Sequence, residues 1–158
     1  MPLLFQGEQK MATTNPLQRA LDKVGIEYQP TEFPNSGLHC SLMLEKEQIQ
    51  PLARALARGG FFIETVTAVD KLKDKVFECI YLFNHYEESL RLLIRVSLPR
   101  SRAVQPSIGK IFPGAVWHER ETTEMFGIKF DGCPDSRNLL LPEDADFHPL
   151  CKDFSGVS

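Results

Sequence analysis

Residues 59–98, GGFFIETVTAVDKLKDKVFECIYLFNHYEESLRLLIRVSL, decide the fold of this chain. Three runs within this stretch are rich in β-branched and aromatic residues, which favours strands. The connections between the runs, KLKDK and YEES, are short and polar. They favour hairpins and antiparallel pairing, because parallel neighbours need a much longer crossover. The predicted strands are Phe61–Ala68, Val76–Asn84 and Leu90–Leu98.

Two helices and one further strand are expected before this stretch. Asn15 is a favourable helix N-cap, Pro16 suits the first turn, and Gly25 follows the last apolar position, so a helix is predicted between them. A second helix is predicted at Gln48–Arg58, where small and apolar residues recur at helical spacing. The strand expected between the two helices is Leu38–Leu44.

After the three strands, a helix is predicted at Ala115–Phe126, with Gly127 as its C-terminal stop. The Pro- and Gly-punctuated residues 103–114 are expected to hold one short helix, and Ile128–Phe130 a short strand. The predicted fold class is α+β: a two-layer domain with a mostly antiparallel four-stranded sheet and helices on one face.

Domain organisation follows from the same patterns. Residues 11–127 are expected to form the domain, and residues 128–158 an extended C-terminal docking arm. Residues 1–10 are set aside as a tag remnant, because LFQG at positions 4–7 resembles a viral protease site used for tag removal.

Charge is distributed unevenly along the 158 residues. The formal net charge of -3 makes nucleic acid an unexpected partner. Residues 1–110 hold 14 Lys and Arg against 12 Asp and Glu, whereas residues 111–158 hold 4 against 9. This acidic C-terminal part also contains prolines and large apolar residues, which favours docking on a basic partner surface. The longest stretch without Asp, Glu, Lys or Arg, Phe33–Leu44, is far shorter than the ~20 residues that span a bilayer. No secretory signal is expected.

No cofactor motif is present in the sequence. Neither of the glycine-rich phosphate-binding motifs, G-x-G-x-x-G and G-x-x-x-x-G-K-[ST], occurs, so no NADH or flavin site is expected in this chain. The spacing of the four cysteines excludes an iron–sulfur cluster pattern, and Cys40 and Cys79 lie in apolar runs where burial is expected.

Three residues of the arm raise the question of a metal site. Cys133, His148 and Cys151 could bind zinc if a fourth ligand came from elsewhere, and the two cysteines could instead form a disulfide. The alternative is unrelated substitution at two exposed positions, because the spacing matches no standard zinc pattern.

Paired carboxylates of the last helix are the other candidates for chemistry. Glu121 and Glu124 share a helical face, and His118 precedes Glu121 by three residues. His118 and Glu121, together with Cys133, could serve a small free-standing enzyme. A structural role is the other interpretation: Arg137 would bind one of the helix glutamates through a bidentate pair and so pin the arm to the helix.

The C-terminal third resembles a known family in its motifs. These are E119-R-E-T-T-E-M-F-G-I-K-F130, G132-C-P-D-S-R137, L139-L-L-P-E-D144 and H148-P-L-C-K-D-F154. The pattern is similar to that of the 30 kDa subunit, also called the C subunit, of respiratory complex I, the NADH:quinone oxidoreductase. Upstream, G60-F-F and T65-V-T-A-V-D70 resemble a weaker segment of the same family. Cys133, Ser136 and Cys151 depart from the family's usual His, Leu and Arg.

The resemblance implies a cofactor-free structural subunit of the peripheral arm of the complex. Its partners would be the large quinone-site subunit, a homologue of the hydrogenase large subunit, and neighbouring iron–sulfur subunits; FMN and the clusters would lie in those partners. The expected location is the cytoplasmic side of a bacterial inner membrane, or the matrix side in an organelle. The alternative is the equivalent subunit of a membrane-bound nickel–iron hydrogenase or formate hydrogenlyase. The residues expected to serve assembly are Glu119, Arg120, Glu121, Glu124, Phe126, Gly127, Arg137, His148, Pro149, Lys152 and Asp153.

Overall fold

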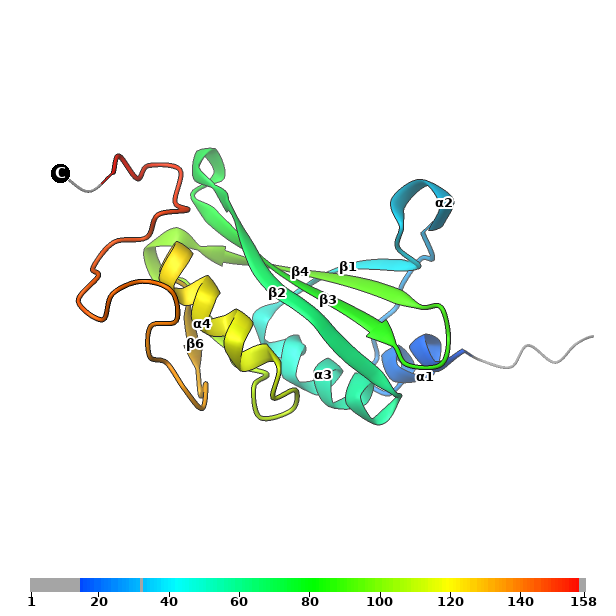
Figure 1. Ribbon diagram of the computed structural model, residues 1–158. Coiled ribbons are helices and arrows are strands. Elements are labelled where there is room, and N and C mark those ends of the chain that lie inside the picture. Colours follow the sequence, from blue (N-terminus) through cyan, green and yellow to red (C-terminus); the bar gives the residue numbers. More distant parts are fainter. Residues whose placement is uncertain (1–14, 32, 157–158) are drawn as a thin grey trace, which may run out of the picture.

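The structure is a computed structural model that describes residues 15–31 and 33–156. A four-stranded sheet forms the centre of the molecule (Figure 1). The spatial order of the strands is β1-β4-β3-β2. β2 pairs with β3 and β3 with β4 in antiparallel fashion, whereas β1 lies parallel to β4. The predicted α+β fold with a mostly antiparallel sheet is confirmed. The strands are β1 (Cys40–Leu44), β2 (Phe61–Lys71), β3 (Val76–His85) and β4 (Arg91–Pro99).

Alternation along the strands places the apolar side chains on the helix side of the sheet. Tyr81 and Phe83 of β3 stand opposite Ile94 and Leu92 of β4, and all four are fully buried. Because successive residues of a strand point to opposite faces, Leu93 between them lies on the other, half-exposed face. The core therefore forms between the sheet and the helices.

The helices at Pro16–Asp22, Ile49–Arg58 and Ala115–Phe126 cover one face of the sheet (Figure 1). The middle one buries Ile49, Leu52 and Leu56 completely, as its helical apolar spacing predicts. The predicted cap is present at the first helix, where the side chain of Asn15 accepts a 2.8 Å hydrogen bond from the Gln18 N–H. The helices are α1 (Pro16–Asp22), α2 (Phe33–Ser36, a single turn), α3 (Ile49–Arg58) and α4 (Ala115–Phe126), with 3-10 turns at Lys46–Gln48, Leu72–Asp74 and Arg100–Arg102.

A second, two-stranded parallel sheet joins segments far apart in the sequence. β5 (Val104–Pro106) pairs with β6 (Lys129–Asp131). The short helix predicted within residues 103–114 is therefore wrong, since this segment contains β5 followed by turns. The strand forms by pairing with the distant β6, and Gln105 at its centre is fully buried. Local sequence does not reveal such a long-range pairing. From Gly132 to the last described residue the chain contains no helix or strand. Residues 132–156 are called the arm from here on.

In the part of the chain that the structure describes, no helix has the length and apolar character needed to cross a bilayer.

Candidate docking surface of the arm

The arm passes beside α4 (Figure 1). Side chains of the helix bind it there. Glu124 is the first of these. Its carboxylate is buried and accepts hydrogen bonds from the backbone N–H groups of Leu139 and Leu140, the latter at 3.0 Å. Hydrogen bonds from several N–H groups to one carboxylate offset much of the free-energy cost of removing its charge from water. The arm backbone thus supplies hydrogen-bond donors to the buried carboxylate of Glu124.

Arg120, one turn earlier on α4, binds the next part of the arm. Its Nε donates to the Arg137 carbonyl at 2.8 Å, and its Nη2 donates to the Asn138 carbonyl at 2.7 Å. Nη1 lies 3.4 Å from an Asp135 carboxylate oxygen. The guanidinium also lies over the Trp117 ring, 5.1 Å from its centroid. Arg120 therefore clamps residues 135–138 with nearly all of its polar groups.

The predicted pairing of Arg137 with a helix glutamate is wrong. Arg137 is 82% exposed at its side chain and pairs within the arm with Asp135, at 2.8 Å. Hydrogen bonds from Arg137, with the charge of Arg120 nearby, hold the pKa of Asp135 well below its usual value. In the arginine contact the roles are the reverse of those expected: the helix supplies Arg120, and the arm supplies carbonyl and carboxylate acceptors. A sequence shows the charges but not which of two arginines faces inward.

The C-terminal end of α4 is capped by the arm. Its last carbonyl groups have no partner within the helix. The ring of His148 donates from Nδ1 to the Glu124 carbonyl at 2.8 Å, and the Leu150 N–H donates to the Met125 carbonyl at 3.0 Å. Gly127 ends the helix with a positive φ of 77°, as its predicted role requires.

A latch at the end of β2 holds the last part of the arm. Asp70 is buried, pairs with the Arg100 guanidinium at 3.0 Å and accepts the Lys152 N–H at 2.8 Å. Arg100 also binds both carboxylate oxygens of Asp153, at 2.7 and 3.0 Å, and these bonds lower the pKa of Asp153. We call Asp70, Arg100 and Asp153 the latch.

Sequence reasoning missed two members of the latch as site residues. Asp70 ends the weaker upstream motif T65-V-T-A-V-D70, and Arg100 follows a strand in a basic stretch typical of a solvated edge. The signal that could have identified Asp70 is its position in a motif of otherwise uncharged residues, where a carboxylate requires a partner.

The other predicted assembly residues lie in different surroundings. Glu119 is fully buried, accepts from the Ser107 hydroxyl at 2.5 Å and the Ile108 N–H at 2.8 Å, and interacts with the Cys133 thiol at the start of the arm; burial raises its pKa. Phe126 packs in the core against Phe77, with ring centroids 6.1 Å apart. Glu121 is exposed on α4, and the half-buried Pro149 lies in the arm.

The structure does not bring Cys133, His148 and Cys151 together. Both cysteines are free thiols, with Cys133 bonded to the Asp135 carbonyl and Cys151 to the Phe126 carbonyl. Among the described residues, only Asp70, Cys151 and Asp153 place three candidate metal ligands within reach of one ion. The described residues therefore form neither the zinc cluster nor the disulfide, two possibilities that the sequence left open beside unrelated substitution. His118 and Glu121 belong to no such group with Cys133 either.

Large apolar side chains remain exposed on the outer side of α4 and the arm. Trp117 is 58% exposed, Leu140 62% and Leu150 55%. Trp117 packs on Arg120, and Leu140, two residues after the segment that Arg120 binds, donates its N–H to Glu124. Fold and site thus define a class of protein. It is an α+β domain that binds an extended arm to its own surface and leaves large apolar side chains of the last helix and the arm exposed.

Comparison with known proteins gives the family. The model for the respiratory-chain NADH dehydrogenase 30 kDa subunit matches residues 42–158. The C subunit of the NADH-quinone oxidoreductase of Roseiflexus castenholzii is 39% identical over 118 residues, which cover 72% of this chain and 68% of the relative. The J subunit of the NAD(P)H-quinone oxidoreductase of Prochlorococcus marinus is 31% identical over 147 residues, covering 88% and 81%. This chain belongs to the 30 kDa subunit family of respiratory NADH dehydrogenase, and the predicted resemblance is confirmed.

Two solved structures share the fold. A chain of the archaeal membrane-bound sulfane sulfur reductase matches with a TM-score of 0.66 and 23% identity, over 73% of this chain and 71% of its own. The trypsin-resistant fragment (1–134) of Nqo5 matches with a TM-score of 0.61 and 24% identity, over 76% and 98%. The family membership makes this chain a subunit of a multisubunit, complex I-like assembly.

Proposed function

We propose that this chain is a cofactor-free assembly subunit of the peripheral arm of an NADH:quinone oxidoreductase, and that it docks on the large quinone-site subunit. FMN and the iron–sulfur clusters belong to partner subunits in this proposal, and the chain lies at the cytoplasmic or matrix side of the membrane. The observation that carries the proposal is the arrangement of α4 and the arm: their polar groups bind one another, whereas Trp117 of α4 and Leu140 and Leu150 of the arm stay exposed.

Preorganisation supports this role. An extended segment that orders only on binding loses conformational entropy at that moment, which weakens the complex. Here the arm is already ordered by Arg120, Glu124 and the latch before any partner arrives. Its outward apolar side chains can therefore contribute their burial to affinity with little further loss of entropy.

Composition of the outer surface favours a protein partner. Aromatic side chains and arginine are enriched in the energetic centres of interfaces, and Trp117 stacked with Arg120 matches that composition. The surplus of acidic residues in residues 111–158 adds long-range attraction toward a basic surface.

The test is affinity purification of the tagged chain from the membranes of its source organism, with mass spectrometry of the proteins that accompany it. The wild-type chain is expected to recover the quinone-site and NADH-binding subunits. The W117A and L140A double variant is expected to reduce their recovery at least about tenfold, since a hot spot contributes about 2 kcal/mol. M43S is the control, because Met43 is 62% exposed on β1, at the sheet edge opposite β2.

The outcomes separate the alternatives. A nickel–iron large subunit without an NADH-binding module would assign the chain to a hydrogenase or formate hydrogenlyase complex. Equal loss with M43S would show that the effect is not specific to the arm surface. Recovery of the chain alone, from the soluble fraction, would contradict the assembly role.

A further inference from the structure

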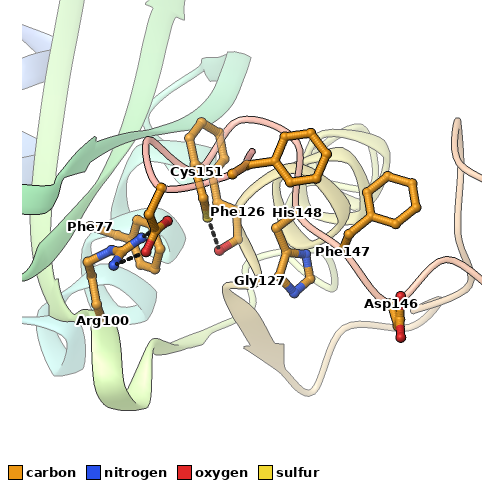
Figure 2. Close-up of a pocket in the computed structure, with 10 residues that line it drawn as sticks. Phe77, Arg100, Phe126, Gly127, Asp146, Phe147, His148 and Cys151 are labelled. Atoms are coloured by element: carbon orange, nitrogen blue, oxygen red, sulfur yellow. Dashed lines mark hydrogen bonds and ion pairs between the residues drawn. The ribbon is translucent and has the colours of Figure 1, made fainter. Parts of the chain in front are cut away.

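A pocket lies between the arm and the end of the sheet, and nothing in the described residues fills it. Its volume is about 410 Å³, and it opens to solvent. Figure 2 shows Arg100 and Asp146 at opposite ends, with His148 and Phe147 between them. We infer that this pocket receives an arginine side chain of the partner subunit; the inference rests on the proposed docking function and names the chemistry of one contact within it.

The walls of the pocket are aromatic. Phe147 and Phe154 stack with ring centroids 5.7 Å apart and an interplanar angle of 20°. Phe126 and Phe77 line the side toward the core. Planar guanidinium groups stack on aromatic faces and bind them through cation–π attraction more often than ammonium groups do. Since the Phe77 ring already has the Arg100 guanidinium over it, 5.1 Å from the ring centroid, the Phe147 and Phe154 rings are those that offer a second guanidinium a flat surface and an electrostatic attraction.

The charged lining residues Arg100, Asp146 and Asp153, taken together with the buried Asp70, carry a net negative charge. The only Lys or Arg among the described lining residues is Arg100, and it already pairs with two carboxylates, the buried Asp70 and Asp153 at the pocket wall. The latch alone thus carries one negative charge. Asp146 adds a second, and no described residue forms an ion pair with it. An incoming cation would meet Asp146 at the end of the pocket that Arg100 does not occupy.

A bound metal ion fits this site less well than a side chain. The three candidate ligands Asp70, Cys151 and Asp153 surround the end that the Arg100 guanidinium already occupies. A metal there would have to displace Arg100 from both of its carboxylates. The free end has one carboxylate and two phenyl rings, which suit an organic cation.

The test uses the full chain and small probes. N-acetyl-arginine-methylamide is titrated while backbone amide shifts are followed by NMR, with N-acetyl-norleucine-methylamide as the apolar probe of similar length. Saturable shifts are expected at residues 146–148, 127 and 154 with the arginine probe. The D146N variant is expected to weaken its binding about two- to fivefold, in line with an exposed ion pair. D144N is the matched control, because Asp144 does not line the pocket.

Three results would overturn the inference: equal binding of the norleucine probe, equal weakening by D144N, or absence of saturable shifts at the pocket. None of them would touch the docking proposal, which is judged by subunit recovery with the W117A and L140A variant. Conversely, subunit recovery could contradict the docking proposal while the arginine probe still binds and still depends on Asp146. The pocket would then be a cation site that serves another partner.

Discussion

The ring of His148 lies against the α-carbon of Gly127, in the space that any other residue would need for its side chain. A β-carbon built on Gly127 would stand 2.8 Å from ring atoms Cδ2 and Nε2 of His148. The same ring donates to the Glu124 carbonyl, so it cannot move away without losing that bond. Gly127 is thus required twice, by its left-handed backbone and by close approach of the arm.

Gly127→Ala is expected to lower the free energy of unfolding by about 1–3 kcal/mol, measured by urea denaturation. Gly132→Ala is a matched control: its φ of 79° gives the same backbone strain, but nothing lies within 4 Å of its β-carbon. Gly132→Ala is therefore expected to lower the free energy of unfolding less than Gly127→Ala. Equal losses would show that contact with His148 has no energetic weight.

Arg120→Lys is expected to loosen the arm, because a lysine cannot bind two carbonyls and Asp135 in the fixed geometry of the guanidinium. Amide hydrogen exchange over residues 135–140 should become at least several-fold faster. Arg137→Lys should change exchange little, since Arg137 is exposed and its side chain binds only within the arm. Faster exchange in Arg137→Lys alone would restore the pairing that the sequence first indicated.

Asp70→Asn keeps the shape of the buried side chain but removes its charge. The variant is expected to lower the free energy of unfolding by about 1–3 kcal/mol, as for other hydrogen bonds to charged groups, and to speed exchange at Lys152. Glu64→Gln is the control, because Glu64 pairs with Arg91 at a half-exposed site where ion pairs contribute about 0–1 kcal/mol. A smaller loss in Asp70→Asn than in Glu64→Gln would contradict the latch.

Glu119 predicts a dependence of stability on pH. Burial raises its folded-state pKa above the unfolded value of about 4.3, so the native state binds the proton more tightly. Its contribution to the free energy of unfolding is full below pH ~4.3 and is lost as the pH rises through the folded pKa. E119Q should flatten this decline in urea denaturation measured from about pH 4 to 8. An unchanged decline would assign the effect to another group.

The pair of Arg100 and Asp153 in the latch makes stability depend on pH in the direction opposite to that of Glu119. Arg100 lowers the pKa of Asp153, so the stabilising contribution of Asp153 is present above its unfolded pKa of about 3.9 and is lost as the pH falls through the folded pKa. D153N should therefore reduce the stability lost on acidification below about pH 4, with little effect on the decline above it. Urea denaturation across this pH range therefore distinguishes the contribution of Asp153 from that of Glu119.

Short-range signals determined much of the fold. The three central strands, the cap at Asn15 and the stop at Gly127 depend on groups only a few residues apart, and each was predictable. The residues of the arm that bear the family pattern were also visible in the sequence. What they bind was not, because a charged side chain can satisfy itself in several ways.

Tertiary structure alone decided which groups of the chain bind one another. The contact between Asp70 and the Lys152 N–H spans 82 positions, and the pairing of β5 with β6 joins segments that local patterns do not relate. Arg120 and Arg137 are both arginines beside the same acidic residue, and only packing of the arm on α4 turns one inward and leaves the other in water. Helices and strands arise from hydrogen bonds and burial that repeat every few residues, whereas these contacts form only after the chain has folded back on itself.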